Sequence, residues 1–229
     1  MEKHAKERGD EIVAIIDPTQ GTIKEDLLGK DFDVIIEFCV PQVALENLTF
    51  YAEHNFKVVM ATTGWWDHLP EVEEMFKKSQ GAIIWSGNFS LGVNLVYQML
   101  DTMSKMMNKF PEYDVMAHEF HHSGKADSPS GTLINMGDIL LKNLDRKTRS
   151  QVNTLNNRPI EPEELHLTST RGGHIPGTHQ VIFDSVFDSI ELKHTARTRD
   201  GFAVGSLVCG EWLKDKQGFY TIQDFTASL

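Results

Sequence analysis

Short apolar runs alternate with helical stretches along the first part of the chain. Each run is closed by proline, glycine or small polar residues, a pattern typical of strands buried on both faces of a parallel sheet. The runs are Ile12–Ile16, Val34–Phe38, Lys57–Ala61 and Ala82–Trp85. Helical spacing predicts helices over about 2–8, 41–52 and 70–79. Strands and helices that alternate in this order predict parallel βα units and a doubly wound sheet.

The pattern changes near residue 90. Helical spacing predicts a long helix over Leu91–Met107 and another from about Pro129 to Leu144. From Leu165 onward, polar and apolar positions alternate with period two, which favours a mostly antiparallel sheet with one covered face. The expected strands are Asp114–Ala117, Leu165–Thr170, Gln180–Phe183 and Ser189–His194. A hairpin turn is expected at Asp184–Asp188 and a last helix over Gly201–Trp212.

These patterns predict an α/β protein with a parallel first domain and an α+β second domain. The last predicted helix is expected to return to the first domain. A chain of 229 residues is long enough for such an arrangement and for a sizeable buried core.

Composition narrows the class of protein. The formal net charge of −11 disfavours nucleic acid and anionic lipid as partners. Cys39 and Cys209 lie far apart in apolar runs, as expected of buried free thiols in a reducing compartment. No apolar run has the length of a membrane span, and the N-terminal residues are too polar for a signal peptide. We therefore expect a soluble, cytoplasmic protein without nucleic-acid or membrane partners.

The densest cluster of polar residues is the segment His118–Thr132. It begins with the letters H-E-x-x-H, a metal-binding pattern that requires a helix with both histidines on one face. A strand-like run leads into the segment, and Ser123-Gly124 interrupts the chain directly afterwards. In a strand, His118 and His122 would lie about 13 Å apart, too far to share a zinc ion. We expect no metal site here, and histidines without any special function are an alternative.

The same segment has the features of an anion site. Ser128 is expected to cap the following helix, and Pro129 suits its first turn. The backbone N–H groups of Ser130, Gly131 and Thr132 then lack partners inside the helix and lie at the positive end of its dipole. This is a place where a carboxylate or phosphate binds.

Three side chains near this helix add charge and proton transfer. Lys125 supplies a full positive charge, and His121 or His122 can exchange a proton near neutral pH. A helix start, a cation and an imidazole together predict an enzyme for a small substrate with two carboxylates and a protonation step.

The segment resembles the signature of the 4-hydroxy-tetrahydrodipicolinate reductase family, also called dihydrodipicolinate reductase. That signature, E-x-H-H-x-x-K-x-D-x-P-S-G-T, is similar to Glu119–Thr132 at every defined position. Further similarity lies at Ala61–Trp65, at Asn88–Asn94, and at Arg171-Gly172-Gly173 with Gly177 and His179. The resemblance extends over nearly the whole chain.

The resemblance implies an enzyme of lysine and diaminopimelate biosynthesis that uses NADH or NADPH. Hydride passes to a cyclic dicarboxylate and water is lost. His121 is implied to donate or accept a proton and Lys125 to be a second proton donor. His122, Gly131 and Thr132 are implied to bind a substrate carboxylate.

The resemblance also implies roles for the two domains. Residues 1–89 and 200–229 would form an incomplete Rossmann-type dinucleotide-binding domain, and residues 90–199 a domain that binds substrate and builds a homotetramer. Asp17 would hold ribose hydroxyls, with a simple turn before Pro18 as the alternative. No arginine follows Asp17, so we expect NADH to serve at least as well as NADPH. The other implied cofactor residues are Ala61, Thr62, Thr63, Ser86, Gly87, Asn88 and Phe89.

The chain departs from the family at its start. The strand and the glycine-rich loop G-x-x-G-x-M-G that open the family are absent, and Gly9 is the only early glycine. Either the reading frame begins late, at an internal Met, or the protein is a shortened form that binds cofactor weakly. The intact later motifs favour the first explanation. A truncated, non-catalytic remnant that binds dicarboxylates or assembles with partners is the alternative function. A semialdehyde dehydrogenase, a further alternative, would need a reactive cysteine.

Overall fold

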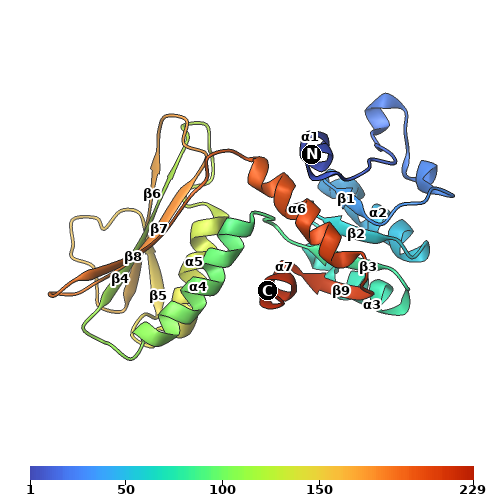
Figure 1. Ribbon diagram of the computed structural model, residues 1–229. Coiled ribbons are helices and arrows are strands. Elements are labelled where there is room, and N and C mark those ends of the chain that lie inside the picture. The colour runs from blue at the N-terminus through green and yellow to red at the C-terminus, as the bar shows by residue number, and fades with distance from the viewer. The chain divides into compact units, whose positions relative to one another are not determined.

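The computed structural model describes residues 1–229. The chain forms two compact units, one of Met1–Leu91 with Asp200–Leu229 and the other of Gly92–Arg199. Both chain ends belong to the first unit, shown in blue and red in Figure 1. Each unit has its own sheet and its own hydrophobic core.

Four parallel strands form the sheet of the first unit, in the order β1-β2-β3-β9. They are β1 (Ile35–Glu37), β2 (Lys57–Met60), β3 (Ala82–Trp85) and β9 (Gly218–Thr221). Successive side chains point to opposite faces, so Val58 and Ile83 enter one core while Val59 and Ile84 enter another. Burial on both faces explains why continuous apolar runs predicted β1, β2 and β3 correctly.

Helices cover both faces of this sheet, so the predicted doubly wound α/β arrangement is confirmed. The helices are α2 (Pro41–Glu53), α3 (Leu69–Lys78), α6 (Asp200–Leu213) and α7 (Ile222–Ala227). Leu48 of α2 and Phe76 of α3 pack on one face. Cys209 of α6 and Phe225 of α7 pack on the other. Neither β9 nor α7 was predicted from the sequence; β9 is short, and none of its residues is fully buried.

The N-terminal segment differs in part from the prediction. α1 (Glu2–Arg8) ends at Gly9 in the left-handed conformation, as expected. The predicted strand Ile12–Ile16 is wrong, because this run pairs with no other strand. Val13 and Ile15 are exposed. Apolar residues alone do not make a strand, since the backbone groups also need a neighbour to bond. Three short 3₁₀ helices lie at η1 (Pro18–Gln20), η2 (Lys24–Leu27) and η3 (Trp66–His68).

Both cysteines are free thiols. Cys209 is buried, as expected, whereas Cys39 is only partly buried because it follows the end of β1. Burial raises the pKa of Cys39 to about 11 and that of Cys209 to about 12. Neither side chain is therefore a thiolate near neutral pH, which argues against cysteine-dependent chemistry.

The second unit has a five-stranded mixed sheet in the order β5-β6-β4-β7-β8. The strands are β4 (Asp114–His121), β5 (Arg149–Val152), β6 (Glu164–Arg171), β7 (Thr178–Asp184) and β8 (Ser189–Thr195). The pairs β4·β7 and β7·β8 are antiparallel, and the hairpin predicted at Asp184–Asp188 is confirmed. The pairs β5·β6 and β4·β6 are parallel, so the expectation of a mostly antiparallel sheet holds for only half of the pairs. The crossover through a helix after β4 permits this parallel pairing.

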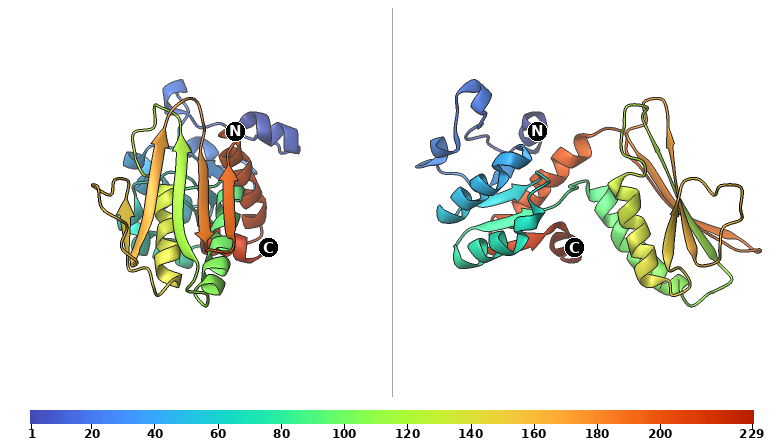
Figure 2. Two further views of the ribbon diagram at one scale, coloured as in Figure 1. Left: turned by 90° about the vertical axis from the view of Figure 1, so that its left-hand side faces the viewer. Right: turned by 180° about the vertical axis from the view of Figure 1, so that it is seen from behind.

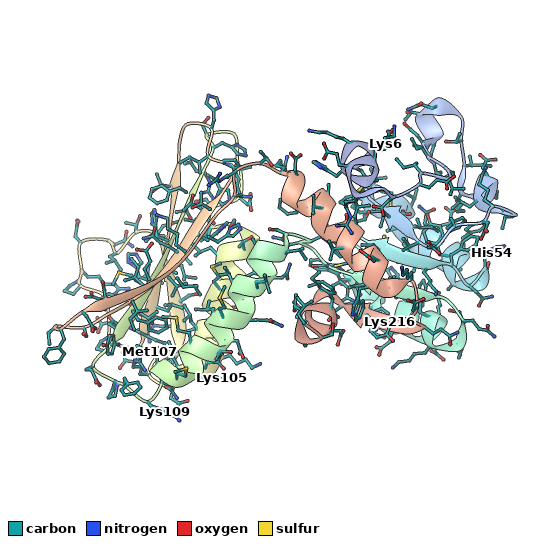
Figure 3. All side chains as sticks on the ribbon, in the orientation of Figure 1. Lys6, His54, Lys105, Met107, Lys109 and Lys216 are labelled. Carbon is teal, nitrogen blue, oxygen red and sulfur yellow. The ribbon has the colours of Figure 1, made fainter.

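Two helices cover one face of this sheet, and no helix of the unit covers the other. They are α4 (Leu91–Met107) and α5 (Gly131–Asn143), which lie behind the strands in the left view of Figure 2. Leu100 of α4 and Leu140 of α5 pack against Phe183 of β7 in a fully buried core. Figure 3 labels Met107 and Lys105 near the end of α4, where Met107 is buried and Lys105 pairs with Asp101 at the surface.

The start of α5 corrects the predicted cap. The helix begins at Gly131 and its cap is Ser130, whose hydroxyl accepts the N–H of Leu133 at 3.2 Å. Ser128, the predicted cap, is exposed and lies outside the helix. The cap is displaced because the Ser130 backbone N–H donates to a buried carboxylate on β4, which anchors the chain at Ser130.

Candidate active site

Alternation along β4 brings two polar side chains into the interior of the second unit. Val115, Ala117, Glu119 and His121 are all buried and point toward the helices. The strand register places Glu119 opposite His179 of β7, and His121 opposite Arg171 of β6. Three neighbouring strands therefore deliver a carboxylate, two imidazoles and a guanidinium to one place.

Glu119 is the centre of this network, which we call the Glu119 network (Glu119, His121, Ser130, Arg171 and His179). Its Oε1 accepts the Ser130 backbone N–H at 2.8 Å and Arg171 Nη2 at 2.7 Å. Its Oε2 accepts the Ser130 hydroxyl and lies 3.3 Å from His179 Nε2. Burial by itself would raise the pKa of Glu119, but hydrogen bonds from His179, Ser130 and Arg171 outweigh it and lower that pKa strongly. Glu119 is therefore ionised near neutral pH.

His121 faces the same carboxylate. Its Nδ1 lies 3.6 Å from Glu119 Oε2, and its ring centroid lies 5.0 Å from that of His179. Burial lowers the pKa of His121 to about 4, and the positive charges of Lys125 and Arg171 act in the same direction. The charge of Glu119 opposes this shift without reversing it. The imidazole is thus neutral near pH 7 and is able to accept a proton.

The first turn of α5 offers free backbone donors. The N–H groups of Gly131 and Thr132 donate no hydrogen bond within the structure, whereas Ser130 and Leu133 are satisfied by Glu119 and by the cap. A Cβ placed on Gly131 would meet nothing within 4 Å, so the backbone is open to a ligand. The amide of Ser130, expected to be free, is not.

Lys125 and His122 lie in the loop between β4 and α5. Lys125 Nζ donates to Asp127 Oδ1 at 2.6 Å, and its charge acts on His121. The His122 backbone N–H donates to Ile175 O at 2.8 Å, and its ring lies beside Gly124. Lys125 thus acts on His121 through its charge, and no hydrogen bond or ion pair joins the side chain of Lys125 or of His122 to the Glu119 network.

The residue types of the network also match those of metal sites. One ligand atom from each of Glu119, His121 and His179 lies within 4.8 Å of the others. Arg171 already neutralises the Glu119 carboxylate, and a divalent cation would lie beside that fixed positive charge. The network therefore fits a hydrogen-bonding role better than a metal centre. The H-E-x-x-H letters lie on a strand and not on a helix, and His118 hydrogen-bonds to Thr168 on β6.

A cavity in the first unit lies at the carboxyl ends of β2 and β3, the edge where parallel α/β sheets bind ligands. It is lined by Phe38, Ala61, Ser86, Gly87, Asn88, Phe89 and Phe202. Most of the cofactor residues implied by the sequence therefore gather here. Gly87 lines the cavity, and a Cβ on it would lie 3.2 Å from the Trp66 ring, so a larger residue there would crowd that ring. The lining of the cavity combines aromatic rings with backbone and hydroxyl groups.

The remaining implied cofactor residues have other surroundings. Thr62 is buried and donates its hydroxyl to Cys39 O at 3.0 Å, while Thr63 is exposed near Gly87. Asp17 caps the turn at Pro18–Gln20, since its carboxylate accepts from Thr19 and Gln20. These bonds favour the turn alternative for Asp17, although a carboxylate has further acceptor sites.

Two known protein families match the chain, and the boundary between the matched segments lies close to the boundary between the two units. Residues 3–89 match the family described as "Dihydrodipicolinate reductase, N-terminus", and residues 92–226 match "Dihydrodipicolinate reductase, C-terminus". The chain belongs to the dihydrodipicolinate reductase family. The resemblance read from the sequence is thereby confirmed, and the protein is an oxidoreductase that requires a nicotinamide cofactor.

Individual members of the dihydrodipicolinate reductase family agree with this assignment. The 4-hydroxy-tetrahydrodipicolinate reductase of Christiangramia forsetii is 36% identical over the whole chain and 93% of its own length. That of Archaeoglobus fulgidus is 36% identical over 89% of the chain and 79% of its own length. A dipicolinate-bound dihydrodipicolinate reductase from Paenisporosarcina has the same fold, with a TM-score of 0.69 at 19% identity, over 84% of this chain and 73% of its own. No helix has both the length and the apolar character needed to cross a membrane.

Glu119, Arg171 and His179 were identified from the sequence only as positions of similarity to the family. Their contacts depend on the register of three strands, which residue spacing does not reveal. One signal was present in the sequence: Glu119 and His121 are two residues apart on a strand, so they share a face.

Proposed function

We propose that this protein reduces 4-hydroxy-tetrahydrodipicolinate to tetrahydrodipicolinate with NADH or NADPH, in lysine and diaminopimelate biosynthesis. One observation carries the proposal: a single buried carboxylate, Glu119, lies beside the imidazole of His121 and also bonds to the residue that caps α5. A proton-transfer group and an anion site are thereby joined, as a reaction on a ring dicarboxylate requires.

Substrate recognition is proposed to use the open amides of α5. A carboxylate that accepts the Gly131 and Thr132 N–H groups would lie at the positive end of the helix dipole. Lys125 would add a charge-assisted hydrogen bond, and His122 a further donor. The dicarboxylate named in the Paenisporosarcina structure is consistent with such a site. In this scheme the second unit, Gly92–Arg199, binds substrate.

Proton transfers are assigned to His121 and Lys125. Loss of the hydroxyl as water needs a proton on the leaving oxygen, which the Lys125 ammonium group supplies. Neutral His121 accepts the proton from the neighbouring ring carbon and later returns it to the ring, so that water leaves and the ring gains one hydride and one proton. Lys125 recovers its proton from solvent.

The first unit is proposed to hold the cofactor, which supplies the hydride when bound. The cavity residues would surround the nicotinamide: Ala61, Ser86, Gly87, Asn88 and Phe89, with Thr62 and Thr63 at its border. No arginine follows Asp17 to receive a 2′-phosphate, so NADH is expected to serve at least as well as NADPH.

A steady-state assay tests the proposed reaction. Freshly formed 4-hydroxy-tetrahydrodipicolinate should cause oxidation of NADH and of NADPH. The loss of absorbance of the reduced nicotinamide measures this oxidation. The matched control replaces His118, which lies three positions before His121 on the opposite face of β4. His118→Ala should retain turnover and His121→Ala should lose it. Tight binding of dipicolinate without any turnover would reject the reductase and favour the non-catalytic remnant.

We also propose a homotetramer built through the open face of the second sheet. Met116, Phe120 and Ile182 are apolar side chains on that face, which no helix of the unit covers. The tip of the β7–β8 hairpin carries Val186 and Phe187, which are 91% and 83% exposed. Exposed apolar groups of this kind favour contact with a second copy of the chain.

A further inference from the structure

The surroundings of His121 differ at its two ring nitrogens. Nδ1 is buried, makes no hydrogen bond and lies 3.6 Å from Glu119 Oε2. Nε2 points toward Gly177, where a Cβ would lie only 3.0 Å away. One nitrogen therefore faces a fixed negative charge, and the other faces a position that has no side chain.

This difference selects one tautomer of the neutral ring. An N–H on Nδ1 points its positive end at the ionised carboxylate, which is favourable. The other tautomer would direct the Nδ1 lone pair at the same carboxylate, and the two would repel. The lone pair of the neutral ring consequently lies on Nε2.

Gly177 keeps that lone pair accessible. It lies between His121 and His179, since a Cβ there would approach His121 Nε2 at 3.0 Å and His179 Cε1 at 3.5 Å. Any side chain would occupy the volume through which a reacting atom must approach Nε2. Gly172 in the same loop is different, because a Cβ there would meet nothing within 4 Å.

We propose that Glu119 is a positioning residue that makes Nε2 of His121 the proton-transfer atom, and that Gly177 leaves this atom uncovered. The inference rests on the proposed function only in assuming that His121 exchanges a proton with the substrate. Glu119 does not touch the substrate in this scheme, since its oxygens already accept from Ser130, Arg171 and His179. It acts through the orientation and charge state of His121.

The direct test is nitrogen-15 NMR of the histidine rings in the full-length protein, with His121 assigned by its loss in His121→Asn. Near neutral pH we expect a neutral His121 ring protonated at Nδ1. Glu119→Gln should lower the Nδ1–H population and lower the pKa of His121, because the favourable negative charge is lost. A ring protonated at Nε2 in the wild type would overturn the proposal. This readout needs no turnover, so it is independent of the proposed reaction.

Kinetics give a second test in the same variants. Glu119→Gln should lower kcat by about 100-fold, the lower end of a general base contribution, and KM for the dicarboxylate much less. The acid limb of the kcat–pH profile of Glu119→Gln should move to lower pH, because the pKa of His121 falls. A purely structural defect would not cause this shift. Glu164→Gln, a buried glutamate of β6 that pairs with Arg158, should leave kcat and the limb unchanged. The proposal would be overturned if Glu119→Gln had the kcat of the wild type and the same acid limb in its kcat–pH profile.

The glycine is tested by a matched pair of substitutions. Gly177→Ala should reduce kcat/KM by at least about 10-fold, since the added methyl group obstructs Nε2. Gly173→Ala, at a second glycine of positive φ where an added Cβ meets nothing within 4 Å, should remain near wild type. The NMR spectrum of Gly177→Ala should still show the Nδ1–H tautomer, which separates obstruction from misfolding. Equal activity of the two alanine variants would contradict the role of Gly177.

Discussion

Glu119 accepts the backbone N–H of Ser130 at 2.8 Å, which ties the strand that carries His121 to the first turn of α5. The two residues are eleven positions apart in the chain and both are buried. This bond fixes His121, the proposed proton-transfer residue, relative to the open helix amides. Geometry at the site thus depends on a backbone contact as much as on the residues that would touch substrate.

Replacing Ser130 should weaken both stability and substrate binding. Ser130→Ala removes the helix cap and the hydroxyl that bonds Glu119, so unfolding free energy should fall by about 1–2 kcal/mol. KM for the dicarboxylate should rise, because the Gly131 and Thr132 amides lose their fixed position. Urea denaturation and steady-state kinetics measure the two effects. Ser128→Ala, at the exposed serine two positions earlier, should change neither, and equal losses in both variants would contradict the cap at Ser130.

His121 and Lys125 should differ in their kinetic signatures. His121→Ala should lower kcat by about 10²–10⁴-fold with little change in KM, because the imidazole acts on the transition state. Lys125→Met should lower kcat and raise KM together, since the ammonium group both binds a carboxylate and supplies a proton. Lys142→Met, at the far end of α5, is the matched control. A His121→Ala enzyme with near-normal kcat would refute the proton-transfer assignment.

Acid should destabilise the fold through His121. Its pKa is lowered from 6.5 to about 4 in the folded state by burial, so the unfolded chain binds more protons between those values. Stability therefore rises with pH across this window and is lost as pH falls. The lowered pKa of Glu119 acts in the same direction at still lower pH. The charged and titratable groups that act on His121 are Glu119, His179, Lys125 and Arg171.

Urea titrations at a series of pH values measure this effect. His121→Gln should show a smaller loss of unfolding free energy between pH 6.5 and pH 4 than the wild type, because the titrating group is gone. The exposed His54, labelled in Figure 3, provides the control variant His54→Gln, which should follow the wild type. Identical pH curves for all three proteins would show that His121 titrates normally.

Cofactor affinity should depend on the absence of a side chain at Gly87. Gly87 lines the cavity, and the side chain added by Gly87→Val would collide with the Trp66 ring and displace the lining around Gly87, so NADH and NADPH should bind at least about 10-fold more weakly. Quenching of tryptophan emission by NADH reports this binding, because the Trp66 ring lies beside Gly87, which lines the cavity. Dipicolinate affinity serves as the internal control and should be unchanged. Unaltered NADH affinity would place the cofactor elsewhere.

Oligomer formation should depend on the open sheet face. Met116→Asp places a charge on that face, and the protein should dissociate to smaller species in sedimentation velocity experiments. Leu95→Asp on α4 is a matched control, because Leu95 and Met116 are 40% and 39% exposed. Tetramers should persist in Leu95→Asp. A Met116→Asp tetramer, or a wild-type monomer, would exclude assembly through this face.

The elements predicted most accurately from the sequence are those whose structure depends mainly on their own residues and little on distant parts of the chain. β3 and α4 have the predicted bounds, since a continuous apolar run and a long helical stripe are each stable in almost any compact fold. The site segment was found because Lys125, His121 and the glycine of a helix start lie close together in the chain. The same reasoning gave a wrong prediction for Ile12–Ile16, because a strand forms only where a neighbouring strand bonds to its backbone. The residues of the run itself do not reveal whether such a neighbour exists.

Residue order alone determined the α/β class, the family and the short segment proposed to carry the chemistry, because these depend on patterns between near neighbours. Tertiary structure decided which serine caps α5, which amides remain open, and which nitrogen of His121 faces a carboxylate. Those features require β4, β6 and β7 to lie in one register, which brings Glu119, Arg171 and His179 together from distant positions. Burial then sets their charges, and burial is a property of the folded chain and not of any single residue.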